Sequence, residues 1–307
     1  MRKDDFLIDE QYEGERLDKG LNLLMEDTVS RSFLQKLIKD GEVFVNDKAQ
    51  KASYVLKEND NVSFELQDPL VPQIEPEKMD IDILYEDNDV IVVNKPKNMV
   101  VHPAPGHYTG TLVNGLMNHC ADSLSGINGV LRPGIVHRID KDTTGSVIAC
   151  KNDRAHECIA KQLEEHTVNR RYRAIVCGVI KDDEGTIDAP IGRDPNNRKK
   201  MSIHSHCGKR AVTHYRVIER FKEYTYIECV LETGRTHQIR VHMASVNHPI
   251  LGDEVYNSSK CKFKLDGQCL HAYILGFEHP DGSGYVETVA PLPLYFEELL
   301  VKLRGIK

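Results

Sequence analysis

Apolar side chains in the first seventy residues recur at two spacings, one helical and one strand-like. Residues three or four positions apart predict a first helix, at Leu17, Leu21 and Leu24. A second helix is predicted over residues 31–39, with Ser30 as its N-cap and Gly41 as its end. Short apolar runs at 43–45 and 62–66 predict strands joined by polar turns. This part of the chain reads as a small unit of two helices and short strands.

A cluster of prolines follows this unit. Pro69, Pro72 and Pro76 occur close together, and proline-rich segments of this kind form extended linkers. The pattern therefore predicts a small domain over residues 1–68, a linker over 69–78 and a larger domain over 79–307.

The larger domain mixes strand and helix signals without a regular order. Apolar runs at 90–93, 147–149 and 173–179 predict buried strands, and residues 224–231 predict a half-buried one; helices are expected at 155–166 and 237–246. No strand-to-helix crossover rhythm emerges, and no glycine-rich phosphate turn follows a strand. The prediction is an α+β fold, a mixed or antiparallel sheet with helices on its flanks, and no nucleotide cofactor.

Composition limits the class of protein. The chain has 307 residues, of which 40% are hydrophobic, enough for about two domains with substantial cores. It lacks an apolar run of the roughly 18 residues that a membrane span needs, and its first residues lack the apolar core of a secretion signal. None of its eight cysteines forms a Cys-x-x-Cys pair. We therefore expect a cytoplasmic protein, not associated with a membrane, with reduced cysteines.

The net charge and the local clusters of charge give different indications about a nucleic-acid partner. The formal charge of −7 argues against a nucleic-acid partner, because phosphate binding requires many Lys and Arg residues. Between Arg193 and Arg216, however, seven basic residues face one acidic residue, and residues 170–173 form a second basic cluster. At this level the clusters are equally consistent with solvated loops and with a phosphate-binding surface.

The segment 134–153 carries the densest candidate chemistry. Asp140 lies two residues after Arg138 and is flanked by apolar stretches, which places a carboxylate at the rim of a core where water is scarce. A second carboxylate, Asp142, follows closely. Residues alone leave an alternative open, in which either aspartate caps a backbone amide in an exposed turn.

A metal site is not expected. His204, His206 and Cys207 lie on a predicted loop too close together to complete a tetrahedral site alone. His237 and His242 are five residues apart, whereas a helical zinc pair needs four. His237 and His242 are expected to support structure or contact RNA.

The small domain resembles a known RNA-binding module. The segments that carry the resemblance are 15–18 (ERLD), 30–32 (SRS), 37–47 (LIKDGEVFVND) and 58–62 (ENDNV). They are similar to the domain first seen in ribosomal protein S-four, which presents basic helical side chains to structured RNA. The resemblance implies RNA contacts by Arg16, Arg31, Lys36 and Lys39.

The larger domain resembles the RluA family of pseudouridine synthases, and within it the RluD type that modifies large-subunit ribosomal RNA. The segments are 94–103 (NKPKNMVVHP), 137–140 (HRID), 171–174 (RYRA) and 233–242 (TGRTHQIRVH), in the family's order and spacing. This resemblance implies an enzyme that isomerises uridine to pseudouridine, most simply in 23S ribosomal RNA. It implies no metal and no cofactor.

The same resemblance assigns roles to individual residues. Asp140 would be the catalytic carboxylate, with Asp142 a turn residue; Arg240 would keep the carboxylate ionised. Tyr172 would stack on the uracil, and flanking arginines suggest that it lies at a solvated strand edge. Arg138 would fill the space left by the extruded nucleotide. Further RNA contacts are expected from Arg193, Arg198, Arg235 and His237.

Two other functions remain open at this stage. A related synthase acting on transfer RNA would share these motifs. A non-catalytic RNA-binding or ribosome-assembly factor is a third hypothesis, which the joint presence of Asp140, Tyr172 and Arg240 disfavours. The expected partners are large-subunit ribosomal RNA and the assembling ribosomal subunit, and we expect a monomer.

Overall fold

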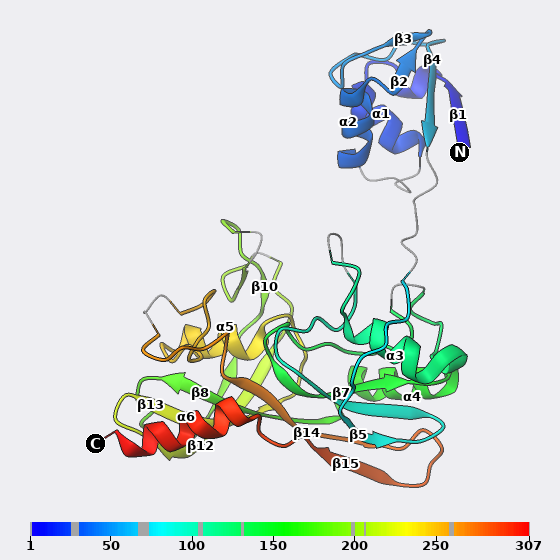
Figure 1. The fold of residues 1–307 in the computed structure, drawn as a ribbon. Coiled ribbons are helices and arrows are strands. Elements are labelled where there is room, and N and C mark those ends of the chain that lie inside the picture. The colour runs from blue at the N-terminus through cyan, green and yellow to red at the C-terminus, as the bar shows by residue number, and fades with distance from the viewer. Residues whose placement is uncertain are drawn as a thin grey trace. The chain divides into compact units, whose positions relative to one another are not determined.

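The computed structural model describes residues 2–25, 31–66, 74–103, 107–129, 132–197, 200–205, 207–257 and 261–306 (Figure 1). The chain divides into two compact units, Met1–Val71 and Pro72–Lys307. Ser30, Arg198, His206 and residues 69–73 of the expected linker lie outside the described residues, so those expectations stay predictions.

The first unit is a four-stranded antiparallel sheet with two helices. Strand order is β1-β4-β2-β3. The elements are β1 (Arg2–Leu7), a 3-10 turn (Glu10–Tyr12), α1 (Leu17–Leu24), α2 (Arg31–Asp40), β2 (Val43–Val45), β3 (Lys48–Ala49) and β4 (Asn61–Leu66). The apolar faces of α1 and α2 pack on the sheet through Leu17, Leu21 and Leu34, which are fully buried. Gly41 follows α2 with φ 78°, a left-handed conformation that suits glycine.

The second unit is built on one large mixed sheet. Among the described residues it has nine strands in the order β5-β6-β7-β14-β8-β13-β12-β9, with β15 also paired to β14. Its strands are β5 (Ile83–Glu86), β6 (Val90–Lys95), β7 (Thr144–Cys150), β8 (Asn169–Cys177), β9 (Glu184–Asp188), β12 (Val212–Arg220), β13 (Tyr224–Leu231), β14 (Leu270–Glu278) and β15 (Tyr285–Val289). The β7–β14 pair is parallel and the other pairs are antiparallel. The predicted mixed sheet with flanking helices is confirmed.

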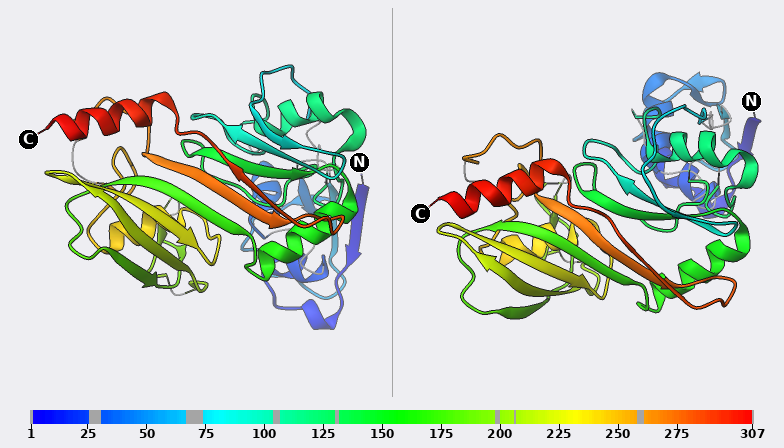
Figure 2. Two further views of the ribbon diagram at one scale, coloured as in Figure 1. Left: turned by 90° about the horizontal axis from the view of Figure 1, so that it is seen from below. Right: turned by 60° about the horizontal axis from the view of Figure 1, so that its bottom comes forward.

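Helices cover both faces of this sheet. Helices α3 (Leu112–Cys120) and α5 (Gln238–Ser245) pack on one face, against alternate strand residues such as Val147 and Ala174. Helices α4 (Asp153–Glu164) and α6 (Leu294–Gly305) pack on the other face, and Figure 2 shows them at opposite ends of the sheet. A small ribbon of β10 (Gly192–Arg193) and β11 (Met201–Ser202) and a 3-10 turn (Ala121–Ser123) complete the elements.

The expected elements match closely, with small shifts at their ends. Helix α4 begins two residues before its predicted start because the Asn152 side chain accepts a hydrogen bond from the backbone of Ala155 and caps the helix. Strand β14 was not predicted, since it is largely buried on both faces and lacks polar alternation. In the part of the chain that is described, no helix combines the length and apolar character needed to cross a membrane.

Candidate active site

A pocket of about 610 Å³ opens on the face of the sheet that carries α3 and α5. Its wall is made by the loop before β7, by two side chains of β8, and by the turn that leads into α5. Asp140, Tyr172 and Arg240, which come from these three parts of the chain, all line it. The fold thus gathers the three predicted catalytic residues in one cavity.

A buried lysine, Lys95, stabilises the loop that carries Asp140 through hydrogen bonds to backbone carbonyls. The backbone N–H of Thr143 donates to the carbonyl oxygen of Asp140 at 3.1 Å and closes the turn. Lys95, which is fully buried, donates through Nζ to the carbonyls of Pro96, Met99 and Lys141 at 2.7–2.9 Å. Burial lowers the pKa of Lys95 to about 7, against the pull of nearby carboxylates. The lysine therefore ties the end of β6 to the turn that carries the candidate carboxylate.

Arg240 lies between two carboxylates. Its Nη1 donates to Asp140 Oδ2 at 2.8 Å, while Nε and Nη2 donate to Asp253 at 2.7 and 3.0 Å. The Asp253 contact is the two-pronged pairing that suits a planar guanidinium. Asp253 is itself fixed, because its Oδ1 accepts from the backbone N–H groups of Val255 and Tyr256. Asp253 thus orients the Arg240 guanidinium, whose Nη1 is left to donate to Asp140 in the pocket.

Burial makes these charges interdependent. The Asp253 side chain is fully buried, which by itself would raise its pKa, yet the Arg240 guanidinium outweighs this effect and holds the pKa below its usual range. Burial likewise opposes the charge of Arg240, and the two carboxylates more than compensate, so its pKa is raised. Asp140 retains some contact with solvent, with 17% of its side chain exposed. It is the member of the triad that a substrate can reach.

The start of α5 is fixed by a buried glutamine. His237 precedes the helix with φ 57°, and Gln238 then accepts from the Thr233 hydroxyl and the Arg235 backbone. The Gln238 amide group donates to the Val212 carbonyl and to Thr213 on β12. These bonds anchor the first turn of α5, and Arg240 follows two residues later. Most of this helix is buried, and Arg240 is buried with it.

Tyr172 lies on the pocket face of β8 and is 8% exposed. Its neighbours Arg171 and Arg173 point to the opposite face, where both pair with Glu228. The expectation that the flanking arginines mark a solvated edge is therefore incorrect, since successive strand residues face opposite sides. Burial raises the pKa of the Tyr172 phenol, and the Asp140 carboxylate adds to this effect.

Three of the residues expected to contact RNA also line the pocket. Arg138 and Arg235 are exposed at its rim. His237 Nε2 lies 3.8 Å from Asp140 Oδ1, and its Nδ1 is 2.8 Å from the Tyr256 hydroxyl. Burial lowers the pKa of His237, which outweighs the attraction of Asp140. The imidazole is therefore neutral near pH 7 and suited to hydrogen bonding.

The other expected RNA contacts are dispersed. Arg193 lies on β10, exposed and away from the pocket lining. In the first unit, Arg16 and Arg31 donate to buried Asp18 at 2.7–3.1 Å, with about half of each side chain exposed. Lys36 and Lys39 are exposed on α2. The two lysines, unlike the two arginines, form no ion pair among the described residues.

Some residues of the site received no role from the sequence. Gly252 and Asp253 match the family pattern after His248 and Pro249, but the match assigned Asp253 no role. Lys95 reads as the polar end of a strand. Arg170 was counted only as part of a basic cluster, yet it is buried in the pocket wall. A charged residue within a buried strand was the signal available for Lys95 and Arg170.

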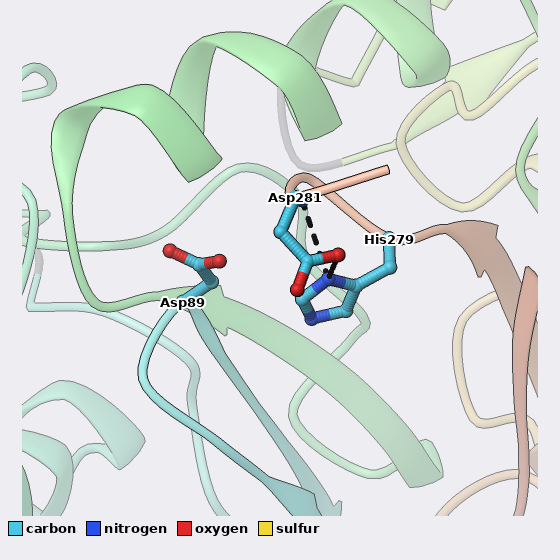
Figure 3. Close-up of side chains that lie close together, drawn as sticks. All are labelled: Asp89, His279 and Asp281. Atoms are coloured by element: carbon cyan, nitrogen blue, oxygen red, sulfur yellow. Dashed lines mark hydrogen bonds and ion pairs between the residues drawn. The ribbon is translucent and has the colours of Figure 1, made fainter. Parts of the chain in front are cut away.

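Another cluster of acidic and imidazole groups lies at the far edge of the sheet. Asp89, His279 and Asp281 bring ligand-type atoms within 4.8 Å of one another (Figure 3). Asp89 is already bound by Arg154 at 2.7 and 2.8 Å and by Asn152. His279 is hydrogen-bonded to Asp281 and to Asp87 at 2.5 and 2.6 Å. Burial opposes the charged imidazole, but the two carboxylates raise the pKa of His279. The cluster is a structural ion-pair network that joins two hairpin turns.

Family models and related proteins match the chain over both units. The model described as RNA pseudouridylate synthase matches residues 89–245, and the model described as S4 domain matches residues 15–62. A Bacillus subtilis (strain 168) protein named uncharacterized RNA pseudouridine synthase YlyB is 53% identical over 304 residues, 99% of each chain. A Zymomonas mobilis protein named ribosomal large subunit pseudouridine synthase D is 45% identical, covering 97% of this chain and 98% of that one.

A solved structure shares the fold of the second unit. Human RNA pseudouridylate synthase domain containing 1 superposes with a TM-score of 0.58 and 24% identity, covering 75% of this chain and 98% of that one. This likeness concerns the fold. It agrees with the arrangement of sheet and helices described above.

Proposed function

Because this chain belongs to the RNA pseudouridylate synthase family, we propose that Asp140 is its catalytic carboxylate and that large-subunit (23S) ribosomal RNA is its substrate. The activity is that of an RNA pseudouridine synthase, an isomerase acting on uridines in RNA. The reaction breaks the bond between uracil N1 and ribose C1′, turns the base while it stays bound, and rejoins it through carbon 5.

The observation that carries the site assignment is the ion pair between Asp140 and Arg240 at 2.8 Å inside the pocket. A carboxylate that attacks the sugar, adds to the base or abstracts a sugar proton must in each case be ionised. An opposite charge at hydrogen-bond distance favours that form, and Asp253 keeps the guanidinium in place. Asp140 then presents its other oxygen, Oδ1, toward the cavity beside His237.

Two further residues complete the proposed mechanism. Tyr172 is buried in the pocket wall, where its ring can stack on the uracil, an interaction of about 1–3 kcal/mol that leaves the base free to turn in its plane. Its phenol is also placed to assist removal of the carbon-5 proton. Arg138 is exposed at the rim, where a planar cation can replace the extruded nucleotide in the stack and contact phosphate.

Several considerations support large-subunit ribosomal RNA as the substrate. Relatives 39–45% identical over 95% or more of this chain are named ribosomal large subunit pseudouridine synthase D. The first unit matches the S4 domain and carries exposed Lys36 and Lys39 on α2. We assign RNA-backbone contacts to these lysines and to Arg16, Arg31, Arg193, Arg198, Arg235 and His237. The proposal includes action in the cytoplasm, as a monomer, on free RNA or on the assembling ribosomal subunit.

Release of tritium from uracil carbon 5 tests the catalytic assignment. Ribosomal RNA carrying [5-³H]uridine should release label with the wild-type protein. The Asp140→Asn variant should bind the RNA and release none. Asp142→Asn is a matched control two residues away, outside the pocket lining, and should release label at the wild-type rate. Equal release by Asp140→Asn and the wild type would refute the assignment.

Mapping pseudouridines in a deletion strain tests the substrate. The proposal predicts that particular pseudouridines disappear from 23S ribosomal RNA and return when the wild-type gene is restored. Loss from transfer RNA alone would establish the alternative substrate. Unchanged pseudouridines together with a defect in subunit assembly would instead support a non-catalytic role in RNA binding.

A further inference from the structure

Arg170 is a buried cation in the pocket wall that no step above uses. It is 7% exposed and lies on β8 two residues before Tyr172, on the same face of the strand. Its Nη2 donates to the backbone carbonyl of Glu232 at 3.2 Å, and its Nε has no hydrogen-bond partner among the residues that the structure describes. The Glu232 carboxylate offers it no charge, because that group pairs with Arg210 and His214.

The other cations of the pocket differ from Arg170 in one of two respects. Arg132, Arg138 and Arg235 are exposed at the rim, as expected of groups that meet hydrated phosphates. Arg240 is buried, but two carboxylates neutralise it. Among the described residues that line the pocket, Arg170 is the buried arginine without a carboxylate within 4.0 Å.

Neighbouring groups increase this imbalance. Burial disfavours the charged form of Arg170 and lowers its pKa, although an arginine remains protonated in proteins. The nearby His137 is half-buried, and desolvation together with Arg170 lowers its pKa to about 3, so it is a neutral ring. His137 Nε2 accepts from the backbone of Ile148 and does not compensate the guanidinium. An unpaired buried charge is costly, and such groups cluster at functional sites.

The reaction creates a negative charge inside this pocket. When the C1′–N1 bond breaks heterolytically, both bonding electrons remain on N1 and the detached uracil is an anion. The charge at C1′ is met by a bond to Asp140, which breaks when carbon 5 attacks C1′, or by loss of a sugar proton, which returns to the sugar at that step. Carbon 5 then bonds to C1′ and gives up its proton, and N1 takes up a proton. Atoms and electrons balance without any oxidant or reductant, and the anion exists only between the two bond changes.

We propose that Arg170 is a catalytic residue that contacts the detached uracil and stabilises its negative charge. A fixed cation in a pocket that excludes water acts most strongly on charge that develops during the reaction. Its place beside Tyr172, which is assigned to the base, suits this role better than contact with the RNA backbone outside. The inference rests on the proposed site at Asp140.

The absence of a side chain at Gly234 leaves room for the Arg170 guanidinium. A Cβ added at Gly234 would lie 2.6 Å from Nη1 of Arg170, closer than such atoms approach. Gly234→Ala therefore displaces the Arg170 side chain without removing its charge. This gives a second perturbation of the same group from another segment of the chain.

Single-turnover tritium release, with RNA affinity measured separately by filter binding, tests the proposal. Arg170→Gln should lower the single-turnover rate at saturating RNA by about 10²- to 10³-fold, the usual effect of losing one group that stabilises developing charge. RNA affinity should change little, and Arg170→Lys should recover part of the rate. Arg171→Gln, the next residue on β8 but on the opposite face, is the matched control and should keep the wild-type rate and affinity.

A more reactive base separates charge stabilisation from positioning. RNA with 5-fluorouridine at the target releases a base that is intrinsically a more stable anion. Because carbon 5 of this base carries fluorine and no proton, the product is the C5-glycosidic isomer that keeps its fluorine. Formation of this isomer or its hydrate, followed by chromatography of the nucleosides, should be impaired less by Arg170→Gln than conversion of uridine is. An equal impairment with both substrates would overturn the proposal.

Other outcomes also decide the question. An unchanged rate, or a defect that disappears at saturating RNA, would show that Arg170 has no catalytic part or contacts only the backbone. If Arg170→Gln fails to fold, Gly234→Ala should show the same rate loss without loss of affinity, and a wild-type rate there would overturn the proposal.

Failure of the proposed function can be distinguished from failure of the Arg170 proposal. If Asp140→Asn stays active, the site assignment fails; if only transfer RNA is converted by the wild type, the substrate assignment fails and the Arg170 variants are compared on that RNA.

Discussion

Replacing Arg240 with methionine should remove activity and also destabilise the fold, for two separable reasons. Methionine fills a similar volume without a charge. Asp140 then loses the cation that favours its ionised form, and Asp253 loses the guanidinium that it binds through both oxygens. RNA binding should be little changed, because Arg240 is buried beneath the groups that meet the backbone.

The structure sets the size of the stability loss. The Asp253 side chain is fully buried, and without Arg240 its remaining partners would be the backbone N–H groups of Val255 and Tyr256. Breaking a buried ion pair by removing one partner costs about 3–5 kcal/mol. Asp140 is partly exposed and contributes less. Misplacement of a reacting group by about 1 Å can cost about 100-fold in rate, so a loss of at least that size is expected.

A double variant separates the two effects. In Arg240→Met with Asp253→Asn the uncompensated buried charge is gone, so a substantial part of the lost free energy of unfolding should return. Activity should not return, since Asp140 still lacks its partner. Urea unfolding measures the first quantity, and single-turnover tritium release at saturating RNA measures the second.

Two results would contradict this reasoning. If the double variant converts uridine at the wild-type rate, the ion pair is not required for catalysis. If Arg240→Met alone unfolds with the free energy of the wild type, the buried triad does not have the energetic role assigned to it.

Three further predictions concern other parts of the chain. Gly145 has φ 107°, and a Cβ added there would lie within 2.2 Å of the Ala272 carbonyl oxygen. Gly145→Ala should therefore lower the free energy of unfolding by about 2–5 kcal/mol. The control Gly284→Ala, at φ 124° in open space, should lower it less. The raised pKa of His279 stabilises the fold fully below about pH 6.5, and this stability is lost as pH rises through the folded-state pKa. His279→Gln should flatten the pH dependence of the free energy of unfolding, measured with urea from about pH 6 to pH 9. An unchanged profile would show that the charged imidazole does not stabilise the fold. Lys36→Ala with Lys39→Ala should weaken RNA binding and reduce the slope of log affinity against log salt by about one per lysine, and an unaltered slope would place the RNA elsewhere.

Sequence reasoning located the elements more reliably than the direction of their side chains. Helices α1, α2 and α5 and strands β6 and β13 follow from apolar spacing, because each buries one stripe or one face. Tyr172 was placed at a solvated edge from its arginine neighbours. Those arginines find a buried glutamate on the other face of the sheet, which depends on how β8 and β13 pair.

The candidate site shows the same limit. Asp140 and Arg240 came from motifs that resemble a known family, and the structure brings them together at 2.8 Å. The roles of Asp253 and Arg170 needed the fold, because the segment around each residue does not show which groups it contacts. Asp253 binds Arg240 across 13 residues of the chain, Arg170 donates to Glu232 across 62, and the Arg170 Nε has no hydrogen-bond partner among the described residues. No local pattern encodes these relations.

The separation of 100 residues between the two members of the central ion pair has a consequence for synthesis on the ribosome. The first unit is built from residues close together in sequence, and such units fold early as the chain emerges. The pocket needs Asp253, and the sheet needs β14 between β7 and β8. A nascent chain therefore folds its S4 domain well before its active-site pocket is complete. The direction of translation makes the first unit available before the second can transform a nucleoside.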